Sequence, residues 1–84
     1  MSDTPESRLA DMIGELARGL VDHPEQVRVE PERDGGATVL CLYVAPEDLG
    51  QVIGRGGRIA RSLRLILREA AHRAGVKVNL EIVD

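Results

Sequence analysis

The stretch Val52-Ile53-Gly54-Arg55-Gly56-Gly57-Arg58-Ile59 decides the fold of this chain of 84 residues. It places three glycines within four residues, between two segments with helical patterns. Glycine has no Cβ atom, so a sugar-phosphate backbone can approach it closely, and the N–H groups that open the following helix point toward such a ligand. Arg55 adds a guanidinium group that can bind phosphate oxygens through paired hydrogen bonds. The stretch therefore predicts either an anion-binding loop or a close-packed corner between two helices.

Two other glycine motifs fit this stretch badly. A dinucleotide-binding fingerprint that begins at Gly54 requires a glycine at position 59, where this sequence has Ile59. A Walker loop requires Gly-Lys followed by Ser or Thr, and the sequence contains no such tripeptide. Nucleotide binding of either kind is therefore not predicted.

The segment after the glycines, residues 58–74, has the pattern of an amphipathic helix that ends at Gly75. With about 100° per residue, four arginines fall within about a third of the helix circumference. The opposite side is apolar. A solvated face usually alternates the sign of its charges, whereas Glu69 is the only acid in this segment. We therefore interpret the arginine side as an anion-binding face, with a solvated face as the alternative. The arginine stripe consists of Arg58, Arg61, Arg64 and Arg68, and the apolar side of Ile59, Leu63, Ile66, Leu67 and Ala70.

Working outward, the remaining segments predict one small α+β domain. Apolar residues at helical spacing predict a helix that Thr4 caps and that the Asp22-His23-Pro24 corner stops. A second, short helix begins at Pro46. Alternating apolar and polar residues predict three strands, of which the first two form a hairpin. These strands are expected over residues 26–32, 37–44 and 76–83.

The order of these elements, α-β-β-α-α-β, predicts the architecture. Two helices join the second strand to the last, so these strands are expected to be parallel. The fold class is therefore an α+β sandwich, in which three helices pack on one face of a three-stranded mixed sheet. Residues 1–84 are expected to form this single domain, with a flexible N-terminus over residues 1–5.

Composition excludes several classes of protein. No apolar run is long enough to cross a membrane, and the N-terminus lacks the pattern of a signal peptide. A single cysteine, Cys41, rules out an internal disulfide and favours a reducing cytoplasm, and two histidines with one cysteine exclude an ordinary zinc cage. Neither a metal nor a cofactor is expected. Tyr43 is the only aromatic residue, which excludes a row of aromatic side chains stacked on bases.

The net charge of −3 conceals an uneven distribution. Residues 1–50 carry 4 basic and 11 acidic side chains, a net charge of −7, whereas residues 51–84 carry 7 basic and 3 acidic ones, a net charge of +4. The local field matters more to a polyanion than the total charge does. The glycine stretch and the helix after it are therefore the segment expected to attract an anion.

The glycine stretch, in this order of elements, resembles the Gly-x-x-G loop of a type II KH domain. The likeness extends to the first helix, the Asp22-His23-Pro24 corner, the segment 44–48 and the closing strand, and covers about residues 6–84. Together these features resemble the KhpA family of small, single-domain bacterial KH proteins. The resemblance implies a cytoplasmic RNA-binding protein, an RNA chaperone or post-transcriptional regulator, with single-stranded RNA as its ligand. It also implies homodimers and a complex with a larger KH-containing partner, KhpB.

The resemblance implies a groove for about four nucleotides, clamped on its backbone side by the glycine loop. The RNA-binding residues are then expected to be Ile53, Gly54, Arg55, Gly56, Gly57, Arg58 and Arg61. Leu49 and Val52, like Ile53, are candidates for an apolar floor under the bases, and core packing is the alternative for all three. The main alternative function is a protein-interaction module with an unused groove.

Catalysis is poorly supported. Glu47 and Asp48 are adjacent acids at a helix start, and such acids mostly interact with the helix dipole. His23 lies in a corner and is expected to be structural, and Cys41 has no histidine near it in sequence. We therefore expect no enzyme activity. For the dimer we expect the long helix, through Ala60, Leu67 and Ala71, with the uncovered sheet face around Cys41, Tyr43 and Asn79 as the alternative.

Overall fold

Thr4 begins the first helix, α1 (Pro5–Leu20), in a computed structural model that describes residues 3–84. Its Oγ1 atom accepts a hydrogen bond of 3.0 Å from the backbone N–H of Ser7, so the predicted cap is confirmed. Asp3 forms an ion pair of 2.9 Å with Arg8. The flexibility expected for residues 1–5 stays a prediction, and residues 1 and 2 lie outside the described residues.

Three strands form one mixed sheet in the order β1-β2-β3. β1 (Arg28–Asp34) and β2 (Ala37–Tyr43) form the predicted antiparallel hairpin, and β2 is parallel to β3 (Val78–Ile82), also as predicted. β1 begins two residues later than the expected strand over 26–32. The reason is a 3-10 turn, η1 (Pro24–Gln26), after which the N–H of Val27 bonds to the carbonyl of Pro24.

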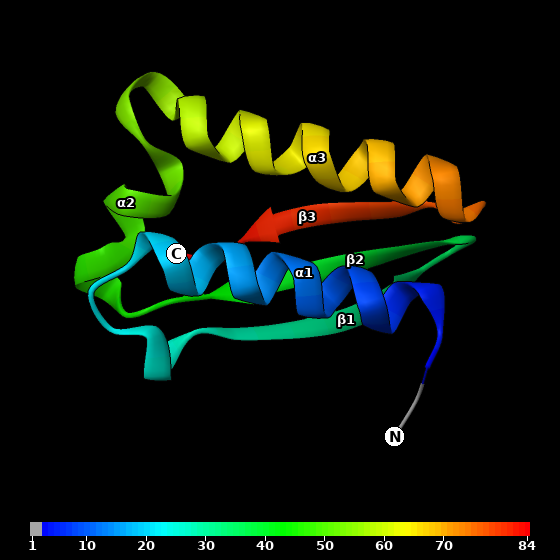
Figure 1. The fold of residues 1–84 in the computed structure, drawn as a ribbon, viewed down its shortest axis with the longest axis horizontal. Coiled ribbons are helices and arrows are strands. Elements are labelled where there is room, and N and C mark those ends of the chain that lie inside the picture. Colours follow the sequence, from blue (N-terminus) through cyan, green and yellow to red (C-terminus); the bar gives the residue numbers. More distant parts are fainter. Residues whose placement is uncertain (1–2) are drawn as a thin grey trace.

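The predicted helical pair around the glycines is present. A 3-10 turn, η2 (Pro46–Asp48), leads into the short helix α2 (Leu49–Ile53), and a second turn, η3 (Arg55–Gly57), leads into the long helix α3 (Arg58–Ala74). α1 packs against β1 and α3 packs against β3, and the two helices run side by side over the sheet, with the α2–α3 loop at one end of the molecule (Figure 1). The predicted fold class is thus confirmed.

The core lies between the helices and the covered face of the sheet. Its fully buried side chains come from all three helices and from β2. Leu67 is 1% exposed and packs in this core, as do Ala60 and Ala71 at 5% and 3%. The long helix therefore cannot form a dimer through these three residues, and that prediction is wrong. The largest buried apolar side chains are Ile13, Leu40, Leu42, Val52 and Leu67.

The other face of the sheet has no helix over it among residues 3–84. Val39, Cys41 and Tyr43 alternate with the core residues of β2 and so lie on this open face. Cys41 is nevertheless only 6% exposed, because it lies in the central strand between Glu30 of β1 and Glu81 of β3. The sheet face that carries Cys41, Tyr43 and Asn79 therefore lacks a covering helix within the described part of the chain, as expected, although Cys41 itself is buried by its neighbours within the sheet.

Candidate nucleic-acid interface

The glycine loop has a backbone that requires glycine. Gly54, Gly56 and Gly57 have φ values of +77°, +65° and +78°, a region that other residues rarely adopt. A Cβ atom at Gly54 would lie 2.7 Å from Cγ1 of Ile59, which is shorter than any normal contact. At Gly56, by contrast, a Cβ atom would meet nothing within 4 Å. Gly54 therefore serves close packing of the helix corner, and Gly56 leaves the outer surface of the loop open to a ligand. The close-packed corner is therefore confirmed at Gly54, whereas anion binding at the loop stays a prediction.

Two arginines beside this loop are exposed and available to an anion. Arg55 lies in the loop and Arg58 opens α3. Among residues 3–84, the four ion pairs involve other cations, so neither side chain is neutralised by an acid of this chain. A guanidinium group without a carboxylate partner keeps its full charge and its donors for a phosphate.

Two further arginines of the stripe contact backbone carbonyl groups of other segments. Nη1 of Arg61 donates a hydrogen bond of 2.9 Å to the carbonyl of Gly56, and thus braces the loop from α3. Nε of Arg64 lies 3.4 Å from the carbonyl of Leu80. This contact places Arg64, one residue of the arginine stripe, beside β3. The sequence did not predict either contact, because both join residues to backbone atoms whose position depends on the fold.

The three apolar candidates for a groove floor differ in how deeply their side chains are buried. Val52 is fully buried and belongs to the core. Leu49 is half-buried and lines a hollow of about 260 Å³ together with Tyr43 and Val83. Ile53 is 36% exposed and lies directly before the loop. Ile53 is therefore the one of the three whose side chain is most accessible to a ligand at the loop.

Asp48 is a residue whose role the sequence did not reveal. It was expected to interact with the helix dipole, and the structure shows that it is also only 1% exposed. Its Oδ2 atom accepts hydrogen bonds from the backbone N–H and from Nδ1 of His23, at 2.9 and 3.0 Å. The hydrogen bond to Asp48 is the main cause that raises the pKa of His23 above its ordinary value of 6.5, and the charges of Asp48, Glu47 and Glu25 add to it. His23 is therefore structural, as expected, with a specific partner.

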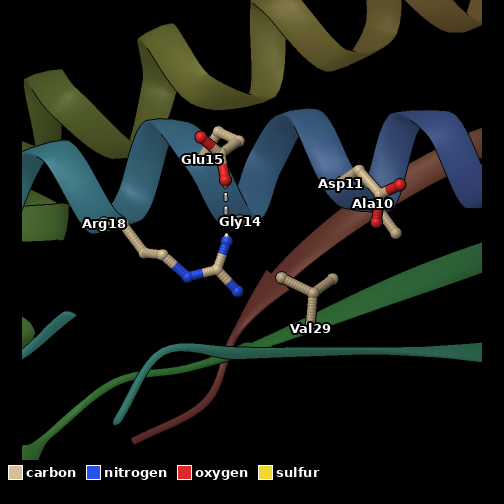
Figure 2. A pocket seen from close by; sticks show the side chains of 6 residues that line it. All are labelled: Ala10, Asp11, Gly14, Glu15, Arg18 and Val29. Carbon is tan, nitrogen blue, oxygen red and sulfur yellow. Dashed lines mark hydrogen bonds and ion pairs between the residues drawn. The ribbon is translucent and has the colours of Figure 1, made fainter. Parts of the chain in front are cut away.

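Other cavities and groups do not provide an alternative site. A hollow of about 310 Å³ between α1 and β1 is lined by Gly14, Val29 and the ion pair of Arg18 with Glu15, and no expected site residue lines it (Figure 2). Residues 3–84 contain no group of side chains that could hold a metal ion. Burial, and then the charges of Glu32 and Glu81, raise the pKa of the Cys41 thiol, which disfavours the reactive thiolate. No helix in this part of the chain is long and apolar enough to cross a membrane.

Comparison with known proteins agrees with this geometry. The family described as "KhpA/KhpB, KH domain" matches residues 10–82, which include the glycine loop and all of α2, α3 and β3. The chain belongs to the KhpA/KhpB family of KH domains. The predicted family is thereby confirmed.

Individual relatives cover most of this chain. A protein of Treponema pallidum is 46% identical over 74 residues, which are 88% of this chain and 92% of the relative. One of Leifsonia xyli is 42% identical over 90% of this chain and 97% of the relative, and one of Halalkalibacterium halodurans is 41% identical over 87% and 96%. All three are named RNA-binding protein KhpA. These relatives in the KhpA/KhpB family are named for RNA binding and not for a reaction, in agreement with the prediction that this chain is not an enzyme.

Proposed function

We propose that this chain binds single-stranded RNA at the loop Gly54–Gly57 and the arginine stripe of α3. The observation that carries the proposal is the open outer surface of the loop at Gly56, with the unpaired cations Arg55 and Arg58 beside it. A loop without side chains lets the RNA backbone approach closely, and the adjacent cations neutralise its phosphates. The names of the KhpA relatives support RNA as the ligand.

The proposed groove runs from the loop along α3 toward the free edge of β3 and holds about four nucleotides. Gly54, Gly56 and Gly57 lie against the RNA backbone, and Arg55 and Arg58 bind its phosphates. Arg61 orients the loop through Gly56 and extends the positive wall with its remaining donors. Ile53 supplies an apolar contact for a base. Since Tyr43 is the only aromatic residue of the chain, a row of stacked aromatic side chains is excluded. Bases are held by their edges and by apolar contact, so the sequence preference of one groove is weak.

We place this activity in the cytoplasm, as an RNA chaperone or post-transcriptional regulator. A weak, unselective groove suits a protein that binds many transcripts briefly. A dimer then raises the avidity for a long RNA by presenting two grooves. The proposed dimer uses exposed apolar side chains of the helical layer, Leu16 and Leu20 of α1 and Ile66 of α3, which are 36–43% exposed. A larger KH-containing partner of the KhpB kind would compete for the same surface.

The test is a charge reversal in the loop with a matched control. The double variant Arg55→Asp/Gly56→Asp places two carboxylates where phosphates are expected, so binding of a labelled single-stranded RNA should be lost in a fluorescence anisotropy titration. For the wild type, three to four phosphate contacts predict that log K falls with log salt with a slope of about −2 to −3. The alternative function, a protein-interaction module with an unused groove, predicts no salt-dependent RNA binding.

The control is Arg33→Asp/Gly35→Asp, in the turn between β1 and β2 at the opposite end of the molecule from the loop (Figure 1). It makes the same change in charge at an exposed arginine and an exposed glycine, Gly35 has a φ of +64° close to the +65° of Gly56, and a Cβ atom at Gly35 meets nothing within 4 Å. We expect it to bind RNA nearly as the wild type does. Equal losses in both variants would indicate a general charge effect and would contradict a site at the loop.

A further inference from the structure

The buried carboxylate of Asp48 is not used by the proposed RNA site. A buried carboxylate is stable only when charged or polar groups satisfy it. Here one residue, His23, supplies two donors to the same oxygen, at 2.9 and 3.0 Å. His23 lies 25 positions earlier in the chain, in the corner between α1 and β1. Asp48 therefore joins two segments that are distant in sequence.

A second contact joins the same two segments. Nε2 of Gln51, within α2, lies 3.4 Å from Oδ2 of Asp22. α2 has only five residues, too few to hold its place as an isolated helix, and Gly54 follows it directly. Val52 packs in the core, Leu49 lies beside Tyr43 and Val83, and α2 also contacts α1 and α3. The two polar contacts add a link between the α2 segment and the corner of residues 21–27, directly before the glycine loop.

We propose that Asp48 and His23 are positioning residues for RNA binding: they hold α2 against the α1–β1 corner and so preorganise the Gly54–Gly57 loop. This inference rests on the proposed function, and it assigns Asp48 no contact with RNA, since Asp48 is 1% exposed. A preorganised loop binds more tightly because less conformational freedom is lost in the complex.

The sign of the effect separates positioning from electrostatics. The charged groups that face His23 are all acidic: Asp48 and Glu47 from η2, and Glu25 from η1. Removal of any one acid makes the local field more positive, and by charge alone RNA binding should become tighter. If Asp48 positions the loop, its neutralisation should instead weaken binding.

The experiment compares Asp48→Asn with Glu47→Gln, a matched neutralisation of the adjacent, exposed acid. The ligand is a fluorescein-labelled single-stranded RNA of mixed sequence, and circular dichroism establishes that each variant is folded. Loss of loop preorganisation should raise the Kd of Asp48→Asn about three- to tenfold, while Glu47→Gln binds as tightly as the wild type or more tightly. A Kd for Asp48→Asn equal to or below that of the wild type would overturn the inference.

A second variant and a second readout keep the test independent of RNA binding. His23→Gln leaves Asp48 and the backbone N–H of residue 23 in place and removes only the bond from Nδ1. In both Asp48→Asn and His23→Gln, amide NMR spectra should show shifted resonances and faster hydrogen exchange at Gly54, Gly56 and Gly57, and unchanged resonances in the β1–β2 turn. Unchanged loop resonances would overturn the inference. If the two variants show shifted loop resonances but the wild type itself binds no RNA, Asp48 and His23 still position the loop, and only the proposed function is contradicted.

Discussion

At the scale of single residues, Gly54 has a conformation that glycine alone adopts readily, with φ +77° and ψ 169°. A methyl group there would also lie 2.7 Å from Cγ1 of Ile59 and 3.0 Å from its backbone nitrogen. We expect Gly54→Ala to lower the free energy of unfolding by about 2–4 kcal/mol, from backbone strain and from the clash. For a domain of this size the melting temperature should fall by at least about 8 °C.

The control at this scale is Gly50→Ala. Gly50 lies in α2, has no positive φ, and a Cβ atom there meets nothing within 4 Å. Since alanine favours helix by about 1 kcal/mol over glycine, this variant should be as stable as the wild type or more stable. Equal melting temperatures for Gly54→Ala and Gly50→Ala would contradict the assigned role of Gly54 in the helix corner.

At the scale of elements, the contact of η2 with the α1–β1 corner predicts a pH-dependent stability. The pKa of His23 is raised in the folded protein, so its contribution to stability is complete below its ordinary value of 6.5 and is lost as the pH rises through the raised value. The melting temperature of the wild type should therefore exceed that of His23→Gln by more at about pH 6 than at about pH 8. Thermal unfolding followed by circular dichroism measures this difference. A difference that does not change with pH would show that the charge of His23 has no part in the contact.

The elements differ in how far the sequence predicted them. α1, the hairpin and α3 carry strong periodic patterns with caps at Thr4 and Gly75, and the structure confirms all three. The role of Asp48 was not predictable in this way, because two acids at a helix start look alike in sequence. Only the fold brings His23 to Asp48 and leaves Glu47 exposed.

The sequence also could not predict which residues on the apolar side of α3 are buried. Helical spacing placed Leu67 and Ile66 together, yet Leu67 is 1% exposed and Ile66 is 43% exposed. α1 and the sheet bury only part of the apolar side of α3. The sequence does not show which apolar residues of this helix stay exposed. The glycine loop and the arginine stripe were predictable as a region, whereas the bonds of Arg61 and Arg64 to carbonyl groups were not.

At the scale of the whole molecule, the exposed apolar side chains of α1 and α3 predict a two-fold dimer through the helical layer. Ile66→Asp should leave the fold intact, because the side chain is 43% exposed, and should shift the protein to a monomer in sedimentation equilibrium at micromolar concentration. It should also bind long RNA more weakly, through loss of avidity.

Tyr43→Ser, on the open sheet face, is the control for the dimer and should stay dimeric. If Tyr43→Ser is monomeric and Ile66→Asp is still dimeric, the dimer interface lies on the open sheet face and not on the helical layer. A wild type that sediments as a monomer at hundreds of micromolar would contradict dimerisation through either surface.

The central claim, that RNA is held at the glycine loop and along the arginine stripe, is tested most directly by amide NMR of the wild type during titration with a single-stranded tetranucleotide. We predict that the largest shift changes fall on residues 53–61 and along the outer edge of β3, and that short duplex RNA produces much smaller ones. Changes concentrated on the open sheet face, or no changes at millimolar RNA, would contradict the claim.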